Sequence, residues 1–305
     1  MTAPASGRTE RRSAGKDISV VVPSYNSRTT IGRCLEALRG QRFDGEYEVI
    51  VVDSSHDGTG EHIEREFPWV KLIHLDERTL PGRARNVGVQ EARAEIVAFT
   101  DADCVPAPDW LGRHRQAQRH HEVVGGALGN ANPGSLVGWA GYLLEFSGYT
   151  PCRRRRGHVA CLVSANISCH KELLRKYPFP EDLWPGEDRV LSWRLAGVTK
   201  LFYDGGIVVG HVNRNSRKDF FRHQVRAGRA AAAAWPRIGL HDRLCRHAWL
   251  AWLTPPWRGL VTVARVLRDT PRYLPTGLLV LPLILAGAAA WARGFHGAAD
   301  GRRPA

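Results

Sequence analysis

The stretch Ala98-Phe-Thr-Asp-Ala-Asp-Cys-Val-Pro106 decides the fold of this chain, because a short apolar run ends there in the aspartates Asp101 and Asp103. The run over residues 96–100 is apolar and β-branched at both ends, a pattern that predicts a buried strand. Acids that follow such a strand lie at the carboxyl edge of the sheet, where open α/β sheets bind ligands. Two carboxylates at this spacing suit a divalent cation such as Mg²⁺ or Mn²⁺. The alternative is a plain strand-ending turn, since Asp is common in turns.

Composition indicates a globular protein with an affinity for anions. The 305 residues are 43% hydrophobic and 24% charged, which fits one large or two ordinary domains. The net charge of +13 favours anionic partners, but zinc-finger spacing and RNP-like aromatic motifs are missing, so we expect no nucleic acid partner. The six cysteines lack zinc-ligand spacing and indicate free thiols in a reducing compartment. Residues 1–16 have no apolar core, so we expect a disordered basic tail rather than a signal peptide.

Strand and helix patterns alternate on either side of the acidic pair. We expect strands at 18–23, 47–52, 70–75 and 96–100, with helices between them, the last two at 60–67 and 82–92. This alternation predicts an α/β fold with a mostly parallel sheet flanked by helices. The sequence has neither G-x-G-x-x-G after the first strand nor a Walker lysine. A metal ion is then the simplest way to meet the charge of a bound phosphate.

Five segments together resemble the family-2 glycosyltransferases, which are inverting nucleotide-sugar enzymes of the GT-A fold. They are Val21-Val-Pro-Ser-Tyr-Asn26, Val51-Val-Asp-Ser-Ser-His-Asp-Gly-Thr59, Gly82-Arg-Ala-Arg-Asn-Val-Gly88, Thr100-Asp-Ala-Asp103 and Gly186-Glu-Asp188. The resemblance implies a GT-A domain at 17–235, with a nucleotide-binding half at 17–130 and an acceptor and catalytic half at 131–235. It implies a UDP-, GDP- or dTDP-sugar donor. The base stays open, because Ser54 stands where the family often has a second Asp.

The resemblance also implies donor-binding residues, which are Pro23, Tyr25, Asn26, Asp53, Arg83, Asp101 and Asn166. Asp53 would accept a hydrogen bond from the base, and Arg83 would contact the diphosphate from the start of a helix. Arg85 is as readily a solvated helix charge. Asn166 would bond sugar hydroxyls or serve as a buried, satisfied amide, and 158–170 would be a strand beneath the sugar.

Metal and catalytic roles are implied for a second set of residues. Asp103 would ligate Mn²⁺ or Mg²⁺, Asp101 would touch the ribose or the metal, and His211 would be a late metal ligand or phosphate contact. Asp188 would be the catalytic base, with Glu187 holding the acceptor or orienting the loop. For both acids the alternative is an ordinary acidic helix start.

Residues 131–235 hold two further patterns. The Arg run at 153–156 is a solvated loop, a contact for anionic lipid or an anionic acceptor, or a contact for the donor pyrophosphate. His223-Gln-Val-Arg226 lacks the Trp that follows the corresponding Arg in processive relatives, so we expect transfer without polymerisation.

The C-terminal region 236–305 has the composition of a membrane-associated segment. No charge lies between Arg272 and Arg293, and Trp249, Trp252 and Trp257 suit a membrane interface. We expect an interfacial helix followed by one membrane helix or a hairpin. The alternative is a buried dimerisation helix or a re-entrant segment. Flanking arginines place the catalytic domain on the cytoplasmic side of the cell membrane.

The sequence therefore predicts a metal-dependent, inverting, non-processive glycosyltransferase. It would transfer a sugar to a hydroxyl of an amphiphilic, lipid-linked or cell-envelope glycan acceptor. The rivals are a nucleotidyltransferase and a catalytically silent nucleotide-sugar-binding or scaffold protein at the membrane. The oligomeric state stays open.

Overall fold

The computed structural model describes residues 16–152, 154–239 and 247–300. Apart from Lys16, the predicted basic tail lies outside the described residues, and so does Arg153 of the Arg run. The strands and helices predicted for the first hundred residues are present close to their predicted bounds.

The first half of the chain builds the parallel part of one sheet. The four strands are β1 (Ile18–Ser24), β2 (Tyr47–Asp53), β3 (Lys71–His74) and β4 (Ile96–Phe99), in the spatial order β3-β2-β1-β4. The connecting helices are α1 (Ile31–Arg39), α2 (Thr59–Glu66) and α3 (Pro81–Glu91). All three strand pairs are parallel, as the alternation predicts.

Beyond β4 the sheet becomes mixed. It continues with β8 (Ile167–His170), β6 (Val123–Asn130), β9 (Leu201–His211) and β5 (Cys104–Pro106), while β7 (Arg156–His158) pairs with β9. Strand β8 is antiparallel to both neighbours, and β5 is antiparallel to β9. Because β9 lies between β6 and β5, the two predicted halves of the domain share one sheet.

The single strand predicted over 158–170 is wrong. The segment contains only the last residue of β7, followed by a 3₁₀ turn over Ser164–Asn166 and by β8. The turn forms because the Asn166 amide donates to the carbonyls of Ala127 and Ile207, where the register between β6 and β9 shifts. Its side chain supplies donors to carbonyls that lie at this irregularity.

Side chains alternate along the strands between two buried cores. On β1, Val20 and Val22 pack towards α1 and the helix α4 (Trp110–Gln118). Val21 faces the opposite core, which it shares with α3 and the helix α7 (Glu187–Ala196). Helix α6 (Lys171–Lys176) contributes Leu174 to the same core. Helices on both faces hold the sheet rigid and leave its carboxyl edge for loops.

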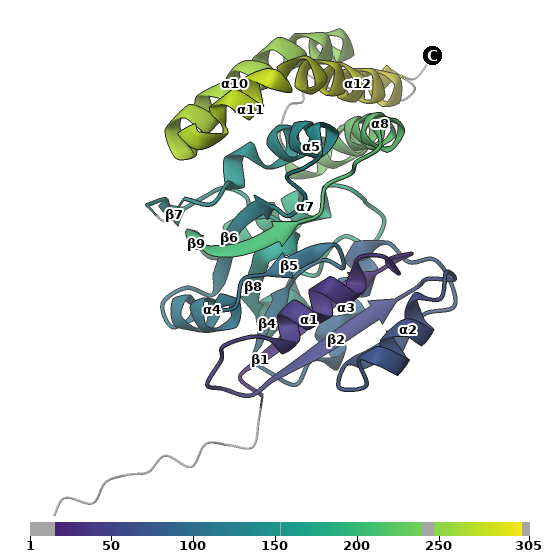
Figure 1. Cartoon of the computed structure of the whole chain (residues 1–305), viewed down its shortest axis with the longest axis vertical. Helices are drawn as coiled ribbons and strands as arrows, with labels where there is room; N and C mark the ends of the chain where they lie inside the picture. Colours follow the sequence, from purple (N-terminus) through teal and green to yellow (C-terminus); the bar gives the residue numbers. More distant parts are fainter. Residues whose placement is uncertain (1–15, 153, 240–246, 301–305) are drawn as a thin grey trace, which may run out of the picture.

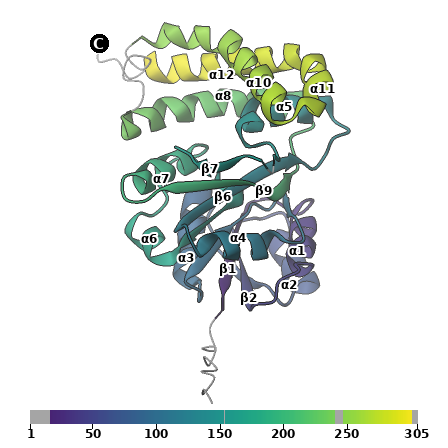
Figure 2. The same cartoon turned by 90° about the vertical axis from the view of Figure 1, so that its left-hand side faces the viewer.

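Helices α5 (Leu136–Phe146) and α8 (Arg217–Ala234) lie between the sheet and the C-terminal helices (Figures 1 and 2). Those helices are the 3₁₀ segment η4 (Ala248–Leu253), α10 (Thr254–Asp269), α11 (Leu274–Leu279) and α12 (Leu281–Asp300). Tyr142, Phe220, Val266 and Ile284 from four of these helices share one buried core. Part of the apolar surface of α12 is therefore buried against other helices of this protein, and part of it faces outward.

Within the described residues, no single helix has both the length and the apolar character needed to cross a bilayer. Two consecutive segments, Pro271–Leu279 and Leu281–Ala299, meet those criteria only when taken together, and a bend of 72° separates them. The membrane helix expected between Arg272 and Arg293 stays a prediction.

Candidate active site

A pocket lies where loops from the carboxyl edge meet the start of α7. Its volume is about 570 Å³. It gathers most of the predicted site residues, namely Pro23, Tyr25, Asn26, Asp101, Asp103, Glu187, Asp188 and His211. Arg83, Asp53 and Asn166 do not line it.

The acidic loop is brought to His211 by strand pairing. Cys104 stands opposite His211 in the antiparallel register of β5 and β9, and the Val212 N–H donates to the Asp103 carbonyl at 2.9 Å. This places Asp103 Oδ2 3.6 Å from His211 Nε2. Asp103, Cys104 and His211 form a group of side chains whose ligand atoms lie within 4.8 Å of one another.

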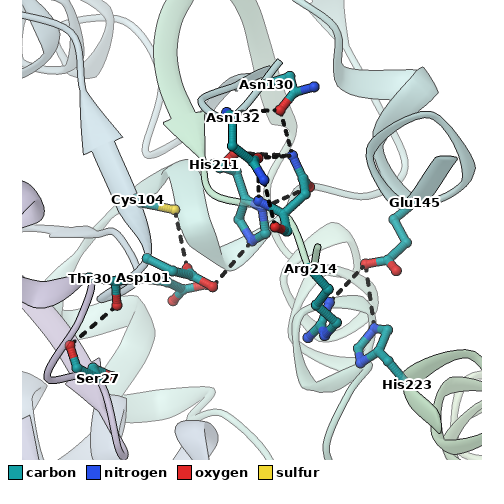
Figure 3. A network of polar contacts seen from close by, with 12 residues as sticks. Ser27, Thr30, Asp101, Cys104, Asn130, Asn132, Glu145, His211, Arg214 and His223 are labelled. Carbon is teal, nitrogen blue, oxygen red and sulfur yellow. Dashed lines mark hydrogen bonds and ion pairs between the residues drawn. The ribbon is translucent and has the colours of Figure 1, made fainter. Parts of the chain in front are cut away.

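Asn213 fixes which nitrogen of His211 faces the acid. The Asn213 amide nitrogen donates to Asn130 Oδ1 at 3.0 Å and to the His211 carbonyl at 3.1 Å, so its oxygen is the atom that faces His211 Nδ1 at 3.0 Å. Nδ1 must then carry a proton, and in the neutral ring the lone pair is on Nε2, towards Asp103. Figure 3 shows this ring between Asn130, Asn132 and the acidic loop.

This donor set fits a cation that prefers oxygen and imidazole ligands. Cys104 is fully buried, and burial, together with Asp103 and Asp101, raises the pKa of its thiol well above the usual range. A neutral thiol is a poor ligand, so the carboxylate of Asp103 and Nε2 of His211 remain. Carboxylate oxygen with imidazole nitrogen suits Mn²⁺.

Asp101 is committed to Arg85 rather than to that group. Arg85 Nη2 donates to Asp101 Oδ1 at 2.7 Å, and Nη1 donates to Glu187 Oε1 at 2.8 Å. Burial acts to lower the pKa of Arg85, but the two carboxylates outweigh it and raise the pKa. The guanidinium therefore stays charged and joins the acidic loop to the start of α7.

The expectation for the two arginines of α3 is corrected by this geometry. Arg85 is 2% exposed, so it is not a solvated charge, whereas Arg83 is exposed and lies outside the pocket. The helix explains the difference, because Gly82, Arg85 and Val89 lie on its buried face. That spacing is visible in the sequence, and it was the signal that could have identified Arg85.

Glu187 and Asp188 begin α7 but differ in their surroundings. Glu187 is buried and paired with Arg85, while Asp188 is partly exposed in the pocket and accepts from the Arg189 N–H at 2.7 Å. Gly186 precedes them with φ of 111°, a conformation that favours glycine. Burial raises the pKa of Asp188, against the opposing effect of Arg189 and Arg85. Asp188 is therefore the carboxylate of this pair that a substrate could reach.

The donor side of the pocket follows β1. Tyr25 is 39% exposed, and the Arg78 guanidinium lies 4.8 Å from the centre of its ring. Asn26 adopts a positive φ of 50°, and its backbone N–H donates to the Ser55 hydroxyl. Arg78 lines the pocket, and it was missed because it stands alone in a loop.

Two predicted donor contacts lie in the interior. Asp53 is fully buried and accepts from the backbone N–H and the hydroxyl of Ser55, at 3.2 and 2.6 Å. Asn166 is also fully buried, and its amide contacts Trp110 and His114 as well as two carbonyls. Of the two alternatives for Asn166, a sugar contact or a buried amide, the structure has the buried amide. Its hydrogen bonds are made inside the protein.

A second polar group lines the pocket between α5 and α8. Glu145 lies 3.4 Å from His223 Nε2 and 3.9 Å from Arg214 (Figure 3). Burial acts to raise the pKa of Glu145, but His223 and Arg214 outweigh it and lower the pKa to about 2. These three residues were missed, although Glu145 is the only charge in the otherwise uncharged α5.

The sheet, the acidic loop and the pocket at the carboxyl edge define a nucleotide-sugar transferase fold of the GT-A type. The family model described as "Glycosyl transferase family 2" matches residues 19–178. The chain belongs to glycosyltransferase family 2, and the protein is a glycosyltransferase.

Named relatives agree with this assignment. Glycosyltransferase AglE of Haloferax volcanii is 27% identical, and the alignment covers 76% of this chain and 79% of that protein. The pre-mycofactocin glycosyltransferase of Mycobacterium tuberculosis is 28% identical over 75% of this chain and 48% of its own length.

Solved structures share the fold. Staphylococcus aureus TarS, residues 1–349 with UDP-GlcNAc, superposes with a TM-score of 0.56 at 19% identity, covering 93% of this chain and 91% of that one. The mannosyltransferase PcManGT of Pyrobaculum calidifontis with GDP-Man and Mn²⁺ gives 0.54 at 20% identity, covering 95% of this chain and 77% of that one.

Proposed function

We propose that this glycosyltransferase is metal-dependent and inverting, and that it transfers one sugar from a nucleoside diphosphate to a hydroxyl of an amphiphilic acceptor. The acceptor would be lipid-linked or part of a cell-envelope glycan, reached from the cytoplasmic side of the membrane. The observation that carries the proposal is the joint presence of the Asp103–His211 pair and the accessible Asp188 in one pocket.

The proposed reaction assigns each group one task. Asp188 accepts the proton of the acceptor hydroxyl, whose oxygen bonds to the anomeric carbon as the bond from that carbon to the diphosphate oxygen breaks. Asp103 and His211 would hold the divalent ion, which when bound neutralises the charge on the leaving diphosphate. Arg85 holds Asp101 and Glu187 in place. Tyr25 and Arg78 offer a ring and a cation to the donor.

The proposed donors are supported by solved structures with this fold, and the proposed acceptor is supported by exposed tryptophans. UDP-GlcNAc and GDP-Man are the ligands named in two structures with this fold, so both sugars are proposals here. The exposed Trp249, Trp252 and Trp257 favour an acceptor at a membrane interface. Arg226 is followed by Ala227 and not by the Trp of processive relatives, which supports the proposal of non-processive transfer.

The first experiment supplies UDP-, GDP- and dTDP-sugars with Mn²⁺ and a lipid extract, and measures the nucleoside diphosphate released. Asp103→Ala should abolish release, and excess chelator should do the same to the unaltered protein. Release that continues in chelator contradicts the metal role. Pyrophosphate formed from a nucleoside triphosphate and a sugar phosphate would instead identify a nucleotidyltransferase. Nucleotide-sugar binding without turnover would identify a binding protein.

A further inference from the structure

A second cavity lies between α8 and α12, outside the active-site pocket. Its volume is about 920 Å³. Its polar lining is basic, and it also includes one tryptophan; the residues that matter here are Arg222, Arg226, Arg229, Arg293, His296 and Trp252. In the part of the chain that the structure describes, no acidic side chain lines it.

The positive charge of this cavity is largely uncompensated. Arg222 has one exposed partner, Asp219, at 3.4 Å, whereas Arg229 and Arg293 have no carboxylate partner among the described residues. Burial lowers the pKa of Arg226, and Arg78, Arg214 and Arg222 lower it further. Arginines held together without acids provide a site for a phosphate, whose oxygens match guanidinium geometry.

The cavity adjoins the acceptor side of the pocket. Arg226 lines the cavity, and its guanidinium lies 4.9 Å from the centre of the Trp184 ring. Trp184 lines the pocket and comes just before Glu187 and Asp188 in the chain. One side chain therefore connects this positive cavity to the loop that carries the proposed base.

Trp252 lines the cavity and belongs to η4, a segment that carries exposed apolar side chains. Trp252 is 49% exposed, and its neighbours in η4, Trp249 and Leu253, are 58% and 60% exposed. An exposed apolar segment beside a positive cavity matches a molecule with a phosphate and an alkyl chain.

We infer that the cavity between α8 and α12 binds the phosphate of an amphiphilic phosphate ester, with the alkyl chain along η4, and that a hydroxyl elsewhere on this ester is the acceptor. Phosphate binding stands on the cavity alone. The assignment of the ester as acceptor rests on the proposed function.

The test measures the binding of dodecyl phosphate, below its micellar concentration, to the full chain. Arg229→Gln combined with Arg293→Gln should weaken binding at least about tenfold, because charge-assisted hydrogen bonds are lost. Arg119→Gln is the matched control, since Arg119 is exposed at the end of α4 and does not line the cavity. The neutral dodecyl maltoside should not distinguish the variants. Equal dodecyl phosphate affinity in the double variant and the control would overturn the inference.

Two further arms separate the sources of phosphate. Inorganic phosphate that binds as tightly as dodecyl phosphate would make the site one for a free anion and overturn the alkyl part. Suppose instead that the double variant loses binding only to phosphatidylcholine vesicles that contain phosphatidylglycerol, and keeps dodecyl phosphate. The cavity would then belong to a membrane-docking surface, and the inference would be wrong.

The acceptor assignment has its own readout. Dodecyl phosphate should inhibit sugar transfer to a lipid extract competitively, while donor hydrolysis to water continues. Absence of inhibition contradicts the acceptor role even if binding is confirmed. Absence of both transfer and hydrolysis in the unaltered protein would refute the proposed function and leave the binding result intact.

Discussion

At the scale of single residues, the candidate site depends on one arginine, which pairs with two of the acids and not with the third. Arg85 bonds Asp101 and Glu187, whereas among the described residues Asp188 bonds only the backbone N–H of Arg189. Two neighbouring carboxylates on the same helix turn thereby acquire different chemical roles. A carboxylate bound to a buried guanidinium is a poor proton acceptor, and one open to the pocket is a good one.

Asp188→Asn is expected to lower the turnover rate by roughly 10²–10⁴, the usual contribution of a general base. Donor affinity should change little, because Asp188 would act on the acceptor. Steady-state rates and a donor Kd measured on the same preparation provide the check. Glu187→Gln is the comparison, and near-normal turnover of Asp188→Asn with a dead Glu187→Gln would move the base to Glu187.

The acidic limb of the pH–rate profile should lie above the ordinary pKa of an aspartate, about 3.9. Burial raises the pKa of Asp188, so the proton returns to it at a higher pH than usual. A protonated Asp188 accepts no proton, and the rate at saturating substrates therefore falls as the pH decreases. Asp188→Asn should lack this limb, and an unchanged limb in that variant would assign it to another group.

Asn213→Ala should weaken Mn²⁺ binding by about 10- to 100-fold, the usual effect of losing a partner that orients a ligand. Asn213 holds the Nδ1 proton of His211 and turns Nε2 towards Asp103. Asn215→Ala is the control, since Asn215 bonds Asn132 and not His211. Calorimetric titration with Mn²⁺ in the presence of a nucleoside diphosphate gives both Kd values. Equal values for the two variants would remove Asn213 from the site.

At the scale of elements, glycines set the contact between α8 and α12. A Cβ on Gly228 would overlap the carbonyl oxygen of Trp291, and one on Gly294 would overlap that of Val225. The two helices thus approach to backbone contact at two points. The same approach forms one wall of the basic cavity, which Gly294 lines.

Gly228→Ala should therefore lower the free energy of unfolding by about 1–3 kcal/mol, the usual effect of overpacking. Gly297→Ala is a matched control on α12, because within the described part of the chain no atom outside its own stretch of helix lies within 4 Å of its added Cβ. That change should be neutral or raise stability by up to about 1 kcal/mol, since alanine favours helix more than glycine does. Denaturant titration of both variants distinguishes them. Equal free energies of unfolding for the two variants would mean that α8 and α12 can move apart at no cost in stability.

Much of the element pattern could be predicted because it is local. The parallel strands β1 to β4 follow from short apolar runs between helical patterns. The short β5 could not, because it exists only by pairing with β9. The choice between a sugar contact and a buried amide for Asn166 stayed open for a similar reason, since its hydrogen-bond partners in β6 and β9 are distant in sequence. Arg85 was open to prediction from the buried face of α3, and only its two partners required the tertiary fold.

At the scale of the whole molecule, the C-terminal helices cover α5 and α8 rather than standing apart (Figure 1). Removing them would expose Tyr142 and Phe220, so a truncated chain tests folding as much as attachment. The outward residues of η4 and α10 give a cleaner test. Trp249 and Trp257 are 58% and 63% exposed.

Trp249→Ser combined with Trp257→Ser should reduce the partition of the full chain into membranes by at least about tenfold, given the apolar area that each ring can bury. The variant should have the same free energy of unfolding as the unaltered protein, because both rings face solvent. Flotation with lipid vesicles measures the partition. An unaltered chain that does not float at all would remove the membrane from the proposed function.

The pairing of β5 with β9 also sets an order of events during synthesis. A ribosome releases Asp103 well before His211, and the two proposed ligand residues meet only when β9 has entered the sheet between β6 and β5. A nascent chain that stops short of β9 has the acidic loop but not the imidazole. If this pair binds a cation as proposed, the affinity should appear only after β9 has joined the sheet, and it would then report that the domain has folded. For the same reason, the two halves of the domain should not form this site when produced as separate fragments.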